Sequence, residues 1–164
     1  MMLRILFLLC FCIITPLQAN VAVDELHALL LKKQASKARS QSSHPEIKEL
    51  SKHYYFAYIF RSTCPHCKKF SPILKDFADS FHIKVRAFSL DNESLAEFES
   101  SPLTPELFQA FYVASGYKPS VPALFLVNRH TLEANAVLFG EATPYQLARR
   151  VHELKQHIEE KFHD

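Results

Sequence analysis

The chain has 164 residues, 48% of them hydrophobic, and a formal net charge of +2. This length suits one compact domain with a substantial core, and 14 Phe and 6 Tyr would supply much of that core. The charge is nearly balanced and the Lys and Arg residues form no basic block, so the composition argues against a nucleic-acid-binding protein.

Residues 1–19 are predicted to be a signal peptide. Arg4 supplies an early positive charge, the apolar run over 5–14 is too short to span a bilayer, and Ala19 is the small residue expected before cleavage. An uncleaved membrane anchor is the alternative interpretation. A lipoprotein fits less well, because Cys10 lies early in the apolar run and follows a large residue. The sequence therefore predicts an exported protein.

Cleavage would leave two cysteines in the mature chain. Cys10 and Cys12 lie in the predicted signal peptide, so that Cys64 and Cys67 remain, in a C-x-x-C spacing. Such a pair is too close in sequence to join distant elements. In an exported protein it indicates a redox site rather than a structural disulfide framework.

The mature chain is predicted to have two parts. Residues 20–53 form a helical extension and linker, with a short helix near its start, a Ser-, Lys- and Gln-rich stretch over 34–45 and a second short helix over 45–53. Residues 54–164 form the domain that carries the fold.

Strands and helices alternate from residue 54 onward. Continuous or alternating apolar runs predict strands over 54–60, 83–90, 123–127 and 134–139. Apolar stripes and N-cap residues predict helices over 65–81, from Thr104 to about Gly116, and from Thr143 onward. The order β-α-β-α-β-β-α, with an antiparallel last pair of strands, predicts an α/β fold: a central mixed sheet with helices on both faces.

The candidate chemistry lies where the first strand feeds its helix. Cys64 falls at the predicted helix N-terminus, where unpaired backbone N–H groups stabilise a thiolate, and His66 can add positive charge. Cys67 lies one turn into the helix. We expect Cys64 to attack and to carry a mixed disulfide, and Cys67 to resolve it.

Other uses of the two cysteines fit the sequence less well. A zinc site would need two more ligands, but the chain has no second C-x-x-C and its histidines are scattered. A c-type haem site needs His after the second cysteine, where Lys68 stands. An inert buried pair is a further alternative, and it fits poorly with a helix N-terminus. The sequence thus predicts no metal and no cofactor.

Several separate points resemble the thioredoxin superfamily over about residues 54–160. They are Cys64-Pro65-His66-Cys67 after an apolar strand, Pro72 at the kink position of the helix, Val121-Pro122 before the third strand, and Gly140 before the last helix. The resemblance implies a thioredoxin-like fold and a cis-proline at Pro122 that faces the two sulfurs. Val121 would then offer backbone groups to an extended substrate chain. The alternative is an ordinary trans-proline at a strand entrance.

Four segments look like the TrbB family, the periplasmic thioredoxin-like disulfide isomerases of F-type conjugative transfer systems. They are Ser62 to Cys67, Phe88-Ser89-Leu90-Asp91, residues 124–128 and residues 131–134. The resemblance implies a periplasmic enzyme that corrects disulfides in proteins of a conjugation, or type IV secretion, apparatus. Its partners would be exported proteins with cysteines and a membrane redox partner that reduces or oxidises the pair.

Two departures keep other functions open. Cys-Pro-His-Cys and the Val before the cis-proline are similar to DsbA-type periplasmic oxidases, although residues 91–118 look too short for the helical domain of that family. Thioredoxins carry an acidic residue six positions before the first cysteine, where this chain has Tyr58. A dithiol oxidase and a non-redox docking or chaperone subunit with the same fold are therefore the alternatives.

Overall fold

The computed structural model describes residues 45–161. The predicted signal peptide over 1–19, with Cys10 and Cys12, and the extension up to residue 44 lie outside the described residues. The elements are α2 (Pro45–His53), β1 (Tyr54–Phe60), α3 (Pro65–Phe81), β2 (Val85–Ser89), β3 (Ser100–Pro102), α4 (Pro105–Phe108), the π-helix η1 (Gln109–Val113), β4 (Ala123–Asn128), β5 (Ala134–Phe139) and α5 (Pro144–Lys161). Over 45–161, no helix is long and apolar enough to cross a membrane.

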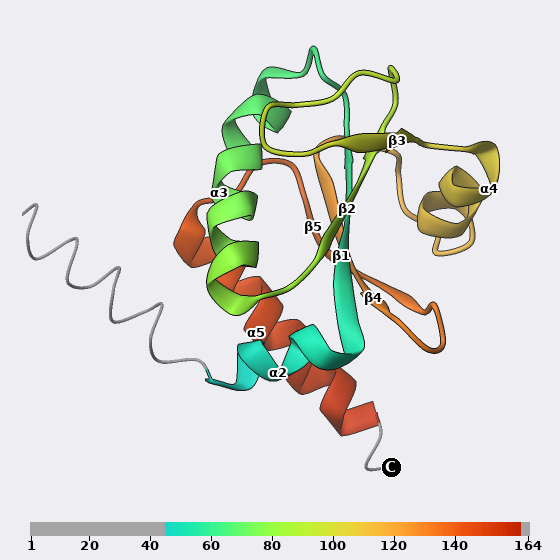
Figure 1. Ribbon diagram of the computed structural model, residues 1–164. Coiled ribbons are helices and arrows are strands. Elements are labelled where there is room, and N and C mark those ends of the chain that lie inside the picture. The colour runs from blue at the N-terminus through green and yellow to red at the C-terminus, as the bar shows by residue number, and fades with distance from the viewer. Residues whose placement is uncertain (1–44, 162–164) are drawn as a thin grey trace, which may run out of the picture. The chain divides into compact units, whose positions relative to one another are not determined.

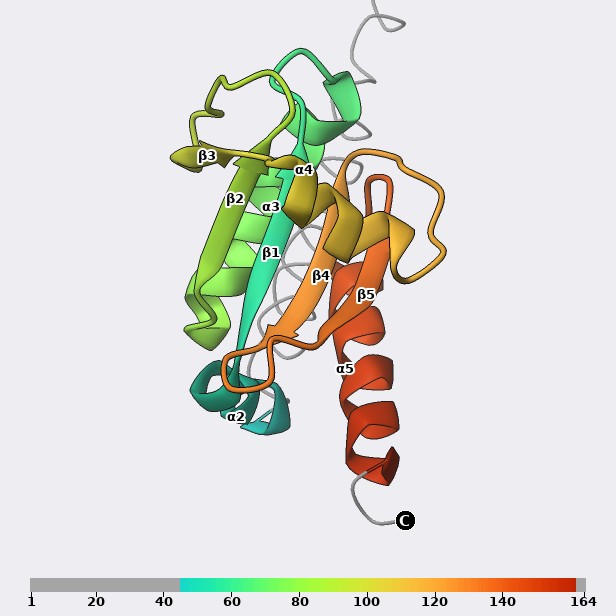
Figure 2. The same cartoon turned by 90° about the vertical axis from the view of Figure 1, so that its right-hand side faces the viewer.

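The five strands form one mixed sheet in the order β3-β2-β1-β4-β5. β1 pairs in parallel with β2 and antiparallel with β4, and β4 and β5 form the predicted antiparallel pair. α3 and α5 cover one face of the sheet and α4 lies on the other (Figures 1 and 2). The prediction of a mixed sheet with helices on both faces is confirmed.

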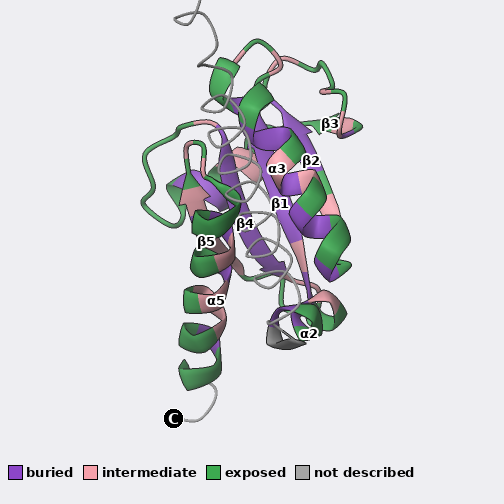
Figure 3. Ribbon diagram, turned by 90° about the vertical axis from the view of Figure 1, so that its left-hand side faces the viewer, coloured by how far each residue is buried: buried purple, intermediate pink, exposed green. Residues whose placement is uncertain are grey.

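The central strand β1 is buried on both faces, because helices cover both (Figure 3). Phe56, Tyr58 and Phe60 point into the larger core cluster, between the sheet and helices α2, α3 and α5. Ala57 and Ile59 point into the smaller cluster, to which η1 contributes Phe111 and Tyr112. This arrangement explains why β1 is an uninterrupted apolar run rather than an alternating one.

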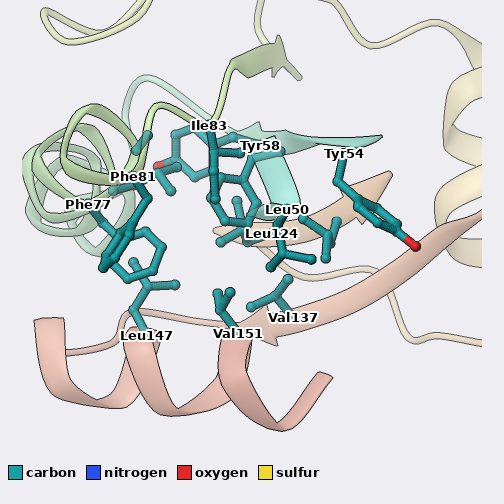
Figure 4. Close-up of a cluster of buried hydrophobic side chains, with 14 of the residues drawn as sticks. Leu50, Tyr54, Tyr58, Phe77, Phe81, Ile83, Leu124, Val137, Leu147 and Val151 are labelled. Atoms are coloured by element: carbon teal, nitrogen blue, oxygen red, sulfur yellow. The ribbon is translucent and has the colours of Figure 1, made fainter. Parts of the chain in front are cut away.

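The larger core cluster includes side chains from α2. Ile47 and Leu50 are buried in the same cluster as the inward side chains of β1. Figure 4 shows Leu50 beside Leu124 and Val137 of the sheet, with Val151 of α5 nearby. The domain's core therefore begins before Tyr54, within residues 45–53, which the sequence predicts to be part of the extension. A nine-residue helix shows too short a pattern to reveal what it packs against.

Both long helices begin where their N-terminal signals predict, and α3 also ends where the apolar stripe predicts. α3 begins at Pro65, continues through Pro72 and ends where His82 adopts a left-handed conformation (φ 57°) and donates its N–H to Asp79. α5 is preceded by a capping box, in which the Gln146 N–H donates to Thr143 Oγ1 (3.3 Å) and the Thr143 N–H donates to Gln146 Oε1 (2.9 Å).

Three details differ from the sequence-based prediction. The second strand is shorter, 85–89 instead of 83–90. The predicted helix after Thr104 divides into a four-residue α-helix and the π-helix η1. The edge strand β3 was not predicted, because Ser100-Ser101-Pro102 has no apolar pattern. None of these alters the order of the central strands, and the architecture is the thioredoxin-like fold that the resemblance implied.

Candidate functional site

Three loops meet at the end of the sheet where β1 leads into α3. β1 and β4 run antiparallel with Ile59 opposite Ala123, so residues just after β1 lie beside those just before β4. The Gly140 N–H donates to the Pro122 carbonyl oxygen (2.7 Å), which brings the loop after β5 to the same place. α2 lies at the opposite end of the sheet (Figure 1).

Cys64 is the N-cap residue of α3 and is partly exposed. Its backbone is extended (φ −75°, ψ 119°), its N–H donates to the Arg61 carbonyl (3.1 Å) and its own carbonyl accepts from the Lys68 N–H (3.1 Å). Its thiol makes no capping hydrogen bond and is free. The first-turn amides, with their partial positive charge, are thus available to a thiolate at this position.

Cys67 lies one turn into α3 with its thiol free and its side chain fully buried. Burial, the largest effect, raises the pKa of Cys67 far above that of an ordinary thiol, and the neighbouring Cys64 thiol raises it further. Hydrogen bonding to the Arg61 backbone and the Tyr58 hydroxyl acts in the opposite direction. The two thiols are therefore unequal: one reaches solvent and the other is a buried, neutral thiol.

A buried pair of hydroxyl groups lies directly beneath Cys67. The Tyr58 hydroxyl lies 3.3 Å from the Cys67 carbonyl oxygen, to which it donates, and 3.1 Å from Ser71 Oγ. Both side chains are fully buried, and burial raises the pKa of Tyr58 strongly, so this hydroxyl is neutral. Tyr58 stands where thioredoxins carry an acid, and the sequence does not indicate its contact with Ser71, because the two residues belong to different elements.

The two residues between the cysteines have different roles. Pro65 occupies the first position of α3, where its missing N–H costs no helical hydrogen bond. His66 is exposed, and its Nδ1 lies 3.1 Å from Glu141 Oε2. This contact links the first turn of α3 to the loop between β5 and α5. Glu141 was not predicted as a site residue, because nothing in its local sequence indicates the contact.

The predicted cis-proline is present: the Val121–Pro122 peptide bond is cis. Pro122 is buried, whereas Val121 is half-buried and packs against the same core cluster as Cys64. Tyr112 of η1 donates its hydroxyl to the Ser120 carbonyl (2.8 Å) and so holds the preceding residue. The site residues predicted from separate parts of the sequence therefore come together at one end of the sheet.

Asp91 also belongs to this end of the molecule. It follows β2, the parallel neighbour of β1, and its carboxylate accepts hydrogen bonds from Ser62 in the loop before Cys64. Asp91 belongs to one of the segments that resemble the TrbB family, but that resemblance implies no role for it. The available signal was its place just after a strand parallel to β1, since the carboxyl ends of parallel strands meet at one edge of a sheet.

This arrangement suits thiol–disulfide exchange. An accessible thiol at a helix N-terminus can attack a disulfide, and a second thiol one turn away can displace the product. Among the described residues, no group of three or more His, Cys, Asp and Glu side chains could hold a metal ion.

Comparisons with known proteins give this site a context. The chain is 36% identical over 78 residues to Protein TrbB of Escherichia coli (strain K12), an alignment that covers 47% of this chain and 42% of that protein. The match thus spans less than half of the length of this relative.

Solved structures with similar folds are more distant. A thiol:disulfide interchange protein of the thioredoxin family from Chlorobium tepidum TLS has a TM-score of 0.49 and 19% identity, covering 65% of this chain and 83% of that one. StoA from Bacillus subtilis has a TM-score of 0.43 and 19% identity, and the match covers 60% of this chain and 81% of StoA.

The family of the chain follows from a longer match. The sequence pattern of the family described as TraF, F plasmid transfer operon protein, matches residues 22–152. This range includes the cysteine pair, the cis-proline and Asp91, and it covers well over half of the chain. The protein belongs to the TraF family of F plasmid transfer operon proteins.

Proposed function

We propose that the protein is a thiol–disulfide oxidoreductase in which Cys64 attacks and Cys67 resolves. The observation that carries this proposal is the inequality of the two thiols: Cys64 is partly exposed at the N-terminus of α3, and Cys67 is buried one turn further on. The cis-proline loop supports the proposal, because a substrate chain that extends past Cys64 would take backbone hydrogen bonds from Val121.

The exchange balances without an added cofactor. The Cys64 thiolate attacks one sulfur of a substrate disulfide, forms a mixed disulfide and releases the other sulfur as a thiolate. In isomerisation, another substrate thiolate then attacks the mixed disulfide and returns Cys64 in its reduced form. When no substrate thiolate attacks, Cys67 resolves the mixed disulfide instead. Its sulfur attacks the sulfur of Cys64, the Cys67 proton passes to the leaving substrate thiolate, and a Cys64–Cys67 disulfide forms.

Trapping of the mixed disulfide tests the roles of the two cysteines. Cys67→Ser should accumulate mixed disulfides with cysteine-containing exported proteins, because Cys64 still attacks and nothing resolves the adduct. Cys64→Ser, the matched control, should trap far less. Equal trapping by both variants would overturn the assignment of attacking and resolving thiols.

We propose that the protein catalyses the isomerisation of disulfides in proteins of a conjugation apparatus. Membership of the TraF family and the similarity to TrbB support a place in F plasmid transfer. The purified, reduced protein should therefore recover activity from scrambled ribonuclease, and the cellular protein should be at least partly reduced. We further propose a periplasmic location, export by the N-terminal signal peptide, and a membrane redox partner that keeps the pair reduced.

A DsbA-like oxidase is the second candidate. Pro65 and His66 between the cysteines favour a stabilised thiolate, which makes a dithiol pair more oxidising. An oxidase would be fully oxidised in cells, would oxidise reduced ribonuclease efficiently and would fail to unscramble the misoxidised form. A docking subunit without redox activity would instead support conjugation with both cysteines replaced by Ser.

A further inference from the structure

One carboxylate joins the end of β2 to the loop that carries Cys64. The Ser62 backbone N–H donates to both oxygens of Asp91, at 3.1 and 3.0 Å, and the Ser62 hydroxyl donates to Oδ2 at 2.8 Å. Ser62 lies only two residues before Cys64. Asp91 therefore contacts the loop close to Cys64 and outside α3.

Asp91 is itself fixed to the sheet. The hydroxyl of the buried Ser89 donates to Asp91 Oδ1 (2.8 Å), and the Asp91 N–H donates to Ser89 Oγ (3.3 Å). The residue between them, Leu90, donates its N–H to the Phe60 carbonyl at the end of β1 (2.9 Å). The carboxylate is thus held by β2 and β1 before it contacts the loop.

Few other contacts fix the loop. The Arg61 and Thr63 side chains are exposed, the Cys64 N–H donates to the Arg61 carbonyl, and the Arg61 backbone forms a hydrogen bond with the Cys67 thiol. Hydrogen bonds from the Ser62 backbone, and then from the Ser89 and Ser62 hydroxyls, hold the pKa of Asp91 well below its ordinary value. The carboxylate is therefore ionised, and the contact intact, at every pH where thiols exchange.

We propose that Asp91 is a positioning residue for Cys64: by fixing Ser62 against the end of β2, it sets the backbone of Cys64 relative to the first turn of α3 and to Cys67. This role deepens the redox function proposed above and rests on it. Reaction rates at a preorganised site are sensitive to displacements of about 1 Å, so a loosened loop should slow the reactions of the Cys64 thiol while the fold persists.

The experiment measures native-state alkylation of Cys64 by iodoacetamide at neutral pH, in a Cys67→Ser background. Asp91→Ala should slow alkylation by roughly three- to tenfold. Asp91→Asn keeps one acceptor oxygen for the Ser62 N–H and should slow alkylation less than Asp91→Ala. Ser62→Ala keeps the backbone N–H and should also slow alkylation less. In the double variant Ser62→Ala/Asp91→Ala, the effect of Ser62→Ala should largely disappear, because both substitutions act through the same contact.

Glu93→Gln is the matched control. It removes a nearby exposed negative charge that is not among the groups bonded to Ser62, and it should leave the alkylation rate unchanged. An equal change in the alkylation rate of Glu93→Gln and Asp91→Asn, in either direction, would overturn the proposal, because the position that Asp91 gives Ser62 would then play no part. Circular dichroism on each variant shows whether it is folded at the temperature of the assay.

A second measurement separates positioning from a merely structural role. With both cysteines present, Asp91→Ala should lower the equilibrium constant for closing the Cys64–Cys67 disulfide with glutathione by at least about threefold, because the loosened loop no longer holds the thiols in register. A folded Asp91→Ala protein with parental alkylation and parental equilibrium would overturn the proposal. Alkylation needs no substrate, so failure of the trapping experiment would contradict the proposed function without touching this result.

Discussion

At the scale of single residues, Tyr58 is the clearest case of a side chain with two functions. Its ring packs against Phe60, Phe70 and Phe98, with centroids 5.3 to 6.0 Å away, while its hydroxyl contacts Ser71 and the Cys67 carbonyl. The position thus contributes to the core and supplies a hydrogen bond beneath the resolving thiol.

Tyr58→Phe keeps the ring and removes the hydroxyl. Because Ser71 then loses a buried partner, we expect a loss of about 1–2 kcal/mol in the free energy of unfolding, measured by urea denaturation. The pKa of Cys67 should rise further, since the Tyr58 hydrogen bond lowers it. Tyr145→Phe, at an exposed position, is the control and should change stability little. A Tyr58→Phe protein as stable as the parent would show that the buried hydroxyl pair contributes nothing.

Asp91 gives a pH-dependent prediction at the same scale. Its pKa is lowered in the folded protein, so its contribution to stability is present above the unfolded value of about 3.9 and is lost as the pH falls below it. The difference in Tm between the parent and Asp91→Asn should therefore be constant near neutral pH and shrink in acid. A difference that persists unchanged to pH 2 would contradict an effect of the carboxylate's ionisation.

The residues that could and could not be predicted differ in a physical way. Cys64, Cys67 and Pro122 are marked by spacing or by resemblance, which are visible along the chain. Asp91 and Ser62 are separated by 29 positions, and their contact depends on the pairing of β1 with β2. The residues around Ser62 and Asp91 in the sequence do not indicate this contact, so this part of the site can be identified only from the folded structure.

At the scale of elements, helix ends were predictable because their signals are local. The capping box at Thr143 and Gln146, and the N-cap at Thr104, both form the hydrogen bonds that their sequences indicate. The short β3 escaped prediction because its three residues, Ser100-Ser101-Pro102, show no apolar pattern. The π-helix η1 escaped because its apolar pattern does not differ enough from that of an α-helix.

The capping box gives the prediction for α5. Thr143→Ala removes the side-chain oxygen that accepts from the Gln146 N–H, and should cost about 1 kcal/mol of stability in thermal or urea unfolding. Gln156→Ala, at an exposed position within the same helix, is the control and should change stability by less than about 0.5 kcal/mol. Similar losses in both variants would contradict a specific contribution of the Thr143 side chain to the start of α5.

At the scale of the whole molecule, the domain depends on a helix that precedes its first strand. Ile47 of α2 is fully buried in the cluster shared by the sheet, α3 and α5. The site lies at the other end of the sheet (Figure 1). The loss of α2 packing should therefore lower stability without changing the geometry around Cys64.

Ile47→Ala tests this separation. The cavity left in the core should cost about 2–5 kcal/mol in the free energy of unfolding, while Cys64 alkylation in the folded protein stays at the parental rate. Lys48→Ala, at the neighbouring exposed position, should change neither quantity. An unchanged stability in Ile47→Ala would contradict the inclusion of α2 in the core, and slower alkylation would show that the two ends of the sheet are coupled.

The central claim, that Cys64 and Cys67 form one reversible redox pair, is tested most directly by equilibrium exchange with glutathione. The purified protein is equilibrated at a series of reduced-to-oxidised glutathione ratios, quenched with acid, and its free thiols are alkylated and counted by mass spectrometry. We expect a single transition in which both cysteines are protected together, absent from the Cys64→Ser and Cys67→Ser variants. Glutathione adducts on Cys64 with Cys67 free throughout, and no internal disulfide at any ratio, would contradict the account.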